Sequence, residues 1–367
     1  MLKLSYILSV IEMKLYKCVT KTKVLMIWTV LMLLTAGLFV FSDECKDGAL
    51  KGIVICISML VPSLFPFYVI SAFMGECGLA ENLAPILKPV GKLLLKSSGA
   101  SAIPVIMSLV GGYPIGARTT AALYKKGLIS ESEASRLSLI AFGAGPGFLV
   151  NFTGVSLLLS KESGIILLSS QIISVLVLAL IARFSEKGEP ADISQPKIRP
   201  NQGACEALVN AVGDSVRAMG AMCGFVVLFS IICNVVSEGL HFEGFVSDIL
   251  LSLIEITTGV TALSGKYSLS YISMLTAFGG LCVHLQVFRE LRGIHFSKPK
   301  FYLYRIYQSI TSLAVTRILL YLFPVEEAVF SSISSPPQIN TYTSVVGFIA
   351  LALTSVLFIL SLHKHSH

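Results

Sequence analysis

The chain has 367 residues, of which 54% are apolar and only 13% are charged, and its formal net charge is +7. A soluble domain carries about 25% charged residues, so this composition, with a mean hydropathy of +0.80, excludes an ordinary soluble protein. Motifs of common enzyme classes such as GxSxG, HExxH and the P-loop do not occur. We expect an all-α polytopic membrane protein that is not an enzyme. No metal is predicted, and no cofactor beyond a coupling proton or cation.

Eight stretches are apolar enough to cross a bilayer, which takes roughly 20 residues. The first, 25–41, follows several lysines and could imitate a signal peptide, but it runs into Ser42-Asp43-Glu44 without a cleavage site of small residues. We therefore expect an uncleaved first span. The other predicted spans are 53–75, 137–160, 163–182, 218–237, 267–288, 306–325 and 343–362.

Two further apolar stretches, 97–117 and 249–265, could either cross the membrane or form re-entrant hairpins that return to the same side. The distribution of Lys and Arg decides, because cytoplasmic segments carry the excess. With two hairpins, 22 of these residues lie inside and 4 outside, whereas two full crossings give 15 and 11. This favours two hairpins, with both termini cytoplasmic. Topology explains the basic excess, so no nucleic-acid partner is expected.

The spans and hairpins group into two repeats with the same order of span, hairpin, interrupted span and span. The first hairpin would enter from the inside and the second from the outside, which makes the repeat inverted. We expect about eight transmembrane helices and two re-entrant hairpins. The predicted organisation is a cytoplasmic N-terminus with the first span (1–52), a first repeat (53–185), a cytoplasmic linker (186–206), a second repeat (207–325), and an outer loop with the last span (326–367).

Glycines interrupt both repeats at membrane depth. Backbone that leaves the helix in a bilayer must be buried in protein or line a wet cavity, and paired broken segments point to a transporter's binding site. Glycine permits unusual backbone and close approach of a ligand, although tight helix packing through small residues is the alternative. The predicted breaks lie at Gly111, Gly112, Tyr113, Pro114 and Gly116 in the first hairpin, Gly145 in the first span, Thr257, Thr258 and Gly259 in the second hairpin, and Gly279-Gly280 in the second span.

Two charged residues lie at the predicted hairpins. Glu255 falls in the middle of the second hairpin, and an intramembrane carboxylate is by default a functional candidate. It could bind a coupling proton or cation or contact a solute, or it could be a structural acid. Arg118 closes the first hairpin. Its guanidinium could meet an anionic solute with a bidentate fork, or it could be an interfacial residue.

Four polar residues follow the breaks in the predicted spans. Asn151 and Thr153 come after the first break, and His284 and Gln286 after the second. Each side chain could orient a solute or a water molecule, or could join neighbouring helices by hydrogen bonds.

The chain resembles the YlbJ-like sporulation integral membrane proteins, within the nucleoside-recognition or Gate group. The resemblance covers about residues 50–325. It depends on Ser63-Leu64-Phe65-Pro66-Phe67, on the Gly111-to-Ala117 motif with the helix start that follows it, and on Glu255-Ile256-Thr257-Thr258-Gly259. The Gly-Tyr-Pro-x-Gly-Ala pattern is the most specific of these motifs.

The resemblance implies a role in endospore formation in which dipicolinate crosses the membrane on the mother-cell side of the forespore. Wider relatives look like concentrative nucleoside transporters, whose paired hairpins hold the solute. We therefore expect a membrane transporter of a small anionic solute, embedded in membrane lipid, in the cell membrane or the outer forespore membrane. A nucleoside-type permease and a non-transporting sporulation scaffold are the alternatives, and oligomerisation is left open.

Overall fold

The computed structural model describes residues 25–26, 28–29, 31–32, 35–77, 79–185, 203–239, 241 and 244–325. All regular structure in these ranges is helical, which confirms the predicted all-α class. Within them the α-helices are α2 (Ser42–Ile55), α3 (Val61–Glu76), α4 (Leu79–Ile86), α5 (Lys88–Leu95), α6 (Ala102–Gly111), α7 (Tyr113–Lys125), α8 (Glu131–Ile140), α9 (Lys161–Ser185), α10 (Ala204–Asn234), α11 (Phe245–Ile254), α12 (Ile256–Leu263), α13 (Leu269–Phe278), α14 (Gly280–Glu290) and α15 (Lys298–Leu322).

Four shorter pieces complete the helical structure. The segments η1 (Cys56–Leu60), η3 (Gly147–Leu157) and η4 (Val235–Gly239) are π-helical, and η2 (Gly99–Ser101) is a 3-10 turn. The predicted first span is described only in part. The predicted last span, 343–362, lies outside the described residues, as does the linker from 186 to 202.

Four continuous helices of the described chain are long and apolar enough to cross a membrane, and they confirm a polytopic membrane protein. They are Ser42–Glu76, Lys161–Phe184, Ala204–Gly239 and Leu269–Glu290. A bent pair, Lys88–Leu95 with Gly99–Gly111, could make a fifth crossing. The number of eight spans and the inverted arrangement of the repeats stay predictions.

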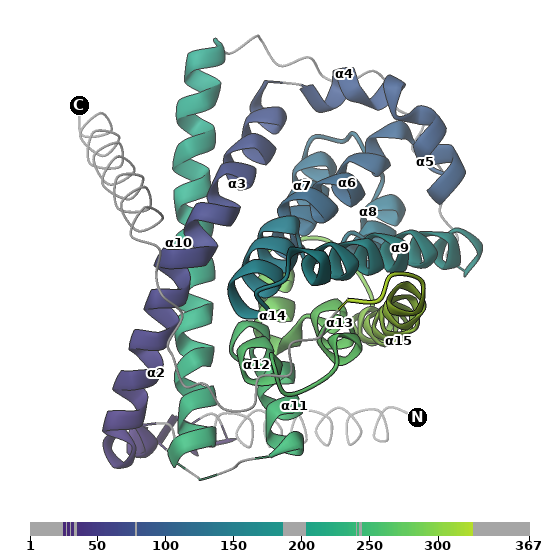
Figure 1. The fold of residues 1–367 in the computed structure, drawn as a ribbon. Coiled ribbons are helices and arrows are strands. Elements are labelled where there is room, and N and C mark those ends of the chain that lie inside the picture. The colour runs from purple at the N-terminus through teal and green to yellow at the C-terminus, as the bar shows by residue number, and fades with distance from the viewer. Residues whose placement is uncertain are drawn as a thin grey trace, which may run out of the picture.

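The longest helices form a pair at one side of the molecule. The continuous helix of α2, η1 and α3 lies along α10 (Figure 1). Gly48 and Gly52 are buried in this contact, and a Cβ on either would lie 2.8 Å from a Cα atom of α10. Small residues therefore let the two backbones approach closely. The helix begins at Ser42, well before the predicted start of the second span at residue 53.

The first hairpin consists of α6 and α7, and it breaks where the glycines predict. Gly112 adopts a φ of +95°, in a region that other residues rarely enter. Helix α7 starts at the next residue, with Pro114 in its first turn, where proline loses no helical hydrogen bond. The short helices α4 and α5, which precede this hairpin, were not anticipated from the sequence.

The second hairpin consists of α11 and α12, and it breaks earlier than predicted. The residue that leaves the helix is Glu255, with an extended backbone (φ −138°, ψ 114°). Thr257, Thr258 and Gly259 lie instead in the first turns of α12. The prediction of a break at these three residues was wrong, because the Glu255 side chain caps α12 and allows the helix to begin before the glycine.

Both predicted interruptions of the later spans are present. Helix α8 ends at Ile140 and the backbone becomes helical again at Pro146, directly before η3, so residues 141–145 are unwound. Helices α13 and α14 meet at Gly279 and Gly280, with φ of +91° and +70°. A capping box opens α8, in which Ser130 and Glu133 form the two reciprocal hydrogen bonds that the Ser-x-x-Glu spacing predicts. Interrupted helices therefore occur in both halves of the chain.

Candidate solute site

A cavity lies where the breaks of the two hairpins meet the first unwound segment. Its empty volume, counted out to its open mouth, is about 510 Å³. Most of its walls are apolar, and the polar groups come from a few side chains and from broken backbone. The lining residues are Leu60, Ser63, Leu64, Gly112, Tyr113, Pro114, Gly145, Phe148, Met222, Val226, Glu255, Ile256, Thr257, Val283 and Gln286.

At the first hairpin, two pieces of non-helical backbone contact each other. A Cβ on Gly145 would lie 3.0 Å from the Gly112 nitrogen and 3.2 Å from the Val110 carbonyl oxygen. A side chain at position 145 would therefore crowd the hairpin tip. This contact brings the tip and the unwound segment to the same wall of the cavity.

The second hairpin makes a similar contact with the second interrupted span. A Cβ on Gly280 would lie 3.0 Å from the Ser252 carbonyl oxygen and 3.3 Å from the Ile256 nitrogen. Each hairpin break thus packs against a glycine of an interrupted span. Gly259 serves a different purpose, because a Cβ there would lie 2.1 Å from the Ser252 Cα within the same hairpin.

The Glu255 carboxylate lines the cavity and is bound to its own helix. One oxygen accepts a hydrogen bond from the Thr257 amide at 3.0 Å, and the other accepts one from the Thr258 amide at 2.6 Å. The residue is 1% exposed. In the part of the chain that the structure describes, no Lys, Arg or His forms an ion pair with it. The amides at the start of α12 are therefore already occupied by this side chain.

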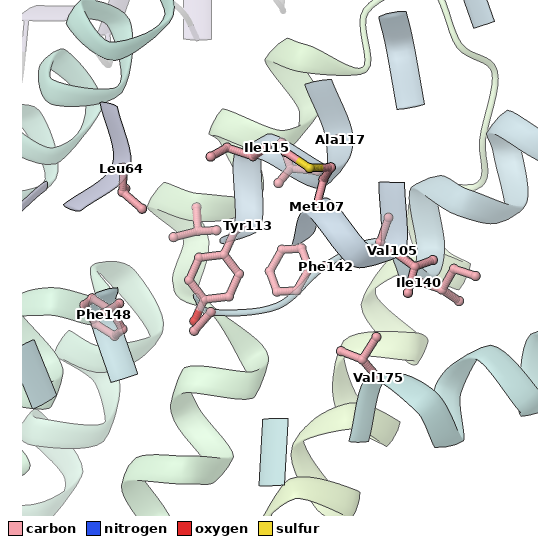
Figure 2. Close-up of a cluster of buried hydrophobic side chains, with 14 of the residues drawn as sticks. Leu64, Val105, Met107, Tyr113, Ile115, Ala117, Ile140, Phe142, Phe148 and Val175 are labelled. Carbon is pink, nitrogen blue, oxygen red and sulfur yellow. The ribbon is translucent and has the colours of Figure 1, made fainter. Parts of the chain in front are cut away.

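Tyr113 forms an aromatic wall of the cavity. Its ring lies beside that of Phe142, with centroids 4.8 Å apart and planes tilted by 50° (Figure 2). Its hydroxyl donates to the Thr276 carbonyl oxygen, near the end of α13. Tyr113 thus connects the first hairpin to the second interrupted span.

Three predicted hairpin residues support the cavity from behind. Gly111 packs against Ile115 and Phe67. Gly116 lies against the Ala141 carbonyl oxygen, which a Cβ there would approach to 2.5 Å. Thr258 contributes the backbone amide that binds Glu255. These residues shape the hairpins without lining the space between them.

Three other predicted site residues lie away from the cavity. The Arg118 guanidinium is near the Asp214 carbonyl oxygen at 3.4 Å and lies 5.5 Å from the centre of the Tyr68 ring. Asn151 is exposed on η3. The His284 Nε2 donates to the Phe278 carbonyl oxygen at 2.8 Å, and its ring packs against Phe301. The geometry therefore does not favour direct contact between these three residues and a solute in this cavity.

The sequence analysis missed several residues of the cavity wall, among them Ser63 and Met222. Gln286, one of the polar residues predicted after the breaks, does line the cavity. It is 6% exposed, and among the described residues its hydrogen-bond partner is the Cys282 sulfur, at 3.3 Å.

The 22 inside residues of the predicted topology include Arg305, counted in the cytoplasmic segment 289–305 before the predicted span 306–325. The structure buries Arg305 completely, and its guanidinium donates to the Leu139 carbonyl oxygen and to Gln308. Removing it from the topology count leaves 21 inside residues against 4 outside. The predicted topology is therefore unchanged, but the residue belongs to the protein interior.

Comparison with known proteins shows that the chain is similar in sequence to a sporulation membrane protein. It is 22% identical over 340 residues to the sporulation integral membrane protein YlbJ of Bacillus subtilis (strain 168), covering 82% of this chain and 83% of that protein. No family model and no solved structure matches. Membership of the Gate group stays a prediction. The resemblance to YlbJ-like sporulation membrane proteins, predicted from the hairpin motifs, is confirmed by a similarity that spans most of both chains.

Proposed function

We propose that this protein is a secondary transporter of a small anionic solute during endospore formation. The observation that carries the proposal is the convergence of three breaks on one cavity. Gly112 of the first hairpin, Glu255 of the second and Gly145 of the unwound segment all line it. Broken helices that meet at a shared cavity are the typical architecture of secondary transporter sites. A membrane scaffold would need no such arrangement.

Pyridine-2,6-dicarboxylate, or dipicolinate, is the leading candidate for the solute. Its flat ring suits a narrow apolar cavity with an aromatic wall at Tyr113. Its two carboxylates suit helix N-termini, whose free amides and positive dipole ends attract anions. Both α7 and α12 begin at the cavity, at Tyr113 and Ile256. The similarity to a sporulation integral membrane protein supports a membrane role in spore formation. The outer forespore membrane is the place that we propose for it.

Glu255 is the proposed coupling residue. While ionised, its carboxylate binds the Thr257 and Thr258 amides that a solute carboxylate would need. It would also repel a dianion. Protonation weakens both effects, because a neutral carboxyl group is a poorer acceptor and carries no charge. Uptake of the solute together with a proton resolves the conflict between an acidic cavity and an anionic solute.

Uptake into vesicles that contain the purified protein tests the function. Radiolabelled dipicolinate should accumulate faster than in empty vesicles, and an imposed proton gradient should increase the rate. Uridine is the comparison solute. If the vesicles take up uridine and ignore dipicolinate, the nucleoside permease replaces this proposal. If neither solute moves under any gradient, the scaffold does.

A further inference from the structure

Arg305 is a buried cation with no anion beside it. It is 0% exposed, and no carboxylate of the described residues lies within ion-pair distance. Arginine keeps its charge in proteins, and an unpaired buried charge is strongly unfavourable. Its Nε also finds no hydrogen-bond partner among the residues that the structure describes. Such a cation needs a compensating interaction.

Part of the compensation comes from the first interrupted span. Arg305 donates to the Leu139 carbonyl oxygen at the end of α8, and it also binds Gln308. The Gln308 amide in turn donates to the Phe142 carbonyl oxygen at 3.1 Å. These carbonyls belong to the helix end and the unwound segment, where the helix dipole favours a cation. They carry only partial charges, so a full positive charge is still present in the interior.

Two aromatic rings, Phe142 and Tyr113, lie between the Arg305 guanidinium and the cavity. Its Cζ atom lies 4.1 Å from the centre of the Phe142 ring. The Phe142 and Tyr113 centroids are 4.8 Å apart, and Tyr113 lines the cavity. Figure 2 shows the Phe142 and Tyr113 rings next to each other. The charge therefore lies behind the aromatic wall, at a distance on the order of 10 Å, without contacting the space itself.

We propose that Arg305 is the specificity-determining charge that makes the cavity select anions over neutral solutes of the same shape. The inference rests on the proposed transport function and adds to it. Arg305 acts through space and through the ring stack, so it is a positioning residue for the solute's charge rather than a contact. With Glu255 ionised, the two formal charges near the cavity cancel. With Glu255 protonated, the Arg305 charge is unbalanced, and an anionic solute supplies the balance.

Three ligands of one shape separate this charge effect from a structural effect. Pyridine-2,6-dicarboxylate carries two negative charges, 6-carbamoylpyridine-2-carboxylate one, and pyridine-2,6-dicarboxamide none. Their affinities for the purified full-length protein in lipid nanodiscs would be measured by titration calorimetry. The wild type should bind the dianion most tightly and the diamide least tightly. A structural role of Arg305 would affect all three ligands alike.

The variant R305Q removes the charge and keeps a hydrogen-bond donor for the Leu139 carbonyl. At an effective dielectric of about 20, loss of a unit charge on the order of 10 Å away should weaken binding by about tenfold for each carboxylate and leave the diamide almost unchanged. R305K keeps the charge and should keep the preference for the dianion. S312A removes a buried hydroxyl of the same helix that is hydrogen-bonded to Ser273, and it is the matched control, because it should not change the preference.

Equal losses for the dianion and the diamide in R305Q would overturn the inference and leave the transport proposal standing. Failure of the wild type to bind any of the anions would overturn both. If R305Q does not fold, two other results decide: the ligand order of the wild type, and retention of the preference in R305K. A wild type that prefers the diamide, or an R305K protein without any preference for the dianion, would contradict the inference.

Discussion

Gly112 and Gly145 contact each other through their backbones, and this contact closes one wall of the cavity. The Gly112 nitrogen would be only 3.0 Å from a Cβ on Gly145. The two residues belong to different broken segments, the first hairpin and the first interrupted span. Their contact means that a movement of either segment changes the cavity.

We expect G145A to destabilise the protein and to impair transport. The added methyl group would contact Gly112, Gly111 and Val110 at 3.0–3.2 Å, closer than ordinary packing. Overpacking of this kind costs about 1–3 kcal/mol. Thermal unfolding in detergent and vesicle uptake measure the two effects. The control is G224A in α10, where nothing lies within 4 Å of the added methyl. Equal stability and flux in the two variants would contradict the close contact.

We expect E255Q to abolish solute flux while the protein still reaches the membrane. Glutamine offers one oxygen acceptor where glutamate accepts from both the Thr257 and Thr258 amides, and it cannot take up a proton. The dependence of flux on the proton gradient should disappear together with the flux. Membrane abundance is followed by immunoblot. Normal, gradient-driven flux in this variant would exclude Glu255 from the mechanism.

We expect Glu133 to stabilise the first hairpin in a pH-dependent manner. Its side chain is fully buried at the start of α8 and accepts hydrogen bonds from Ser97, Ser98, Ser101 and the Ser130 amide. Burial opposes ionisation, but the hydrogen bonds from Ser97, Ser130 and Ser98 outweigh it and hold the pKa of Glu133 below its ordinary value. The group therefore ionises more readily in the folded protein than in the unfolded chain.

For a group with a lowered folded pKa, the stabilisation is fully present above the unfolded pKa of about 4.3 and is lost as the pH falls through the folded pKa. Near neutral pH, E133Q should lose roughly 1–3 kcal/mol, as expected for hydrogen bonds to a charged group. As the pH falls below about 4, the difference between the wild type and the variant should shrink, and it should vanish once the pH is below the folded pKa of Glu133. Melting temperatures across pH 3–7 measure this, with E131Q at the exposed neighbour Glu131 as the control. A constant difference at all pH values would contradict the shift.

We expect the turn after α7 and the loop after α12 to face opposite sides of the membrane. Lys125 lies in the predicted inner segment and Lys266 in the predicted outer one, and both are exposed. In a variant without native cysteines, K266C should react with an impermeant thiol reagent added to intact cells. K125C should react only after permeabilisation. External labelling of K125C would overturn the hairpin topology.

The sequence by itself determined the class of protein and most of the break points. Long apolar stretches with few charges permit only a helical membrane fold, because lipid cannot satisfy free backbone groups. Gly112 and Gly279 were recognisable as break points because glycine adopts a positive φ far more readily than other residues. In the structure both residues have a positive φ. The capping box at Ser130 and Glu133 was equally local, since it needs only two side chains at a fixed spacing.

The tertiary structure decided which residues share the cavity. Asn151 and His284 looked alike in sequence, but helix rotation turns the first outward and packs the second among aromatic rings. The position of the second break depended on Glu255 capping its own helix. Arg305 was counted among the charges of a cytoplasmic segment, because a sequence shows that a residue is charged but not that it is buried. Its partners, Leu139 and Phe142, lie more than 160 residues away in the chain, so only packing between distant helices could reveal it.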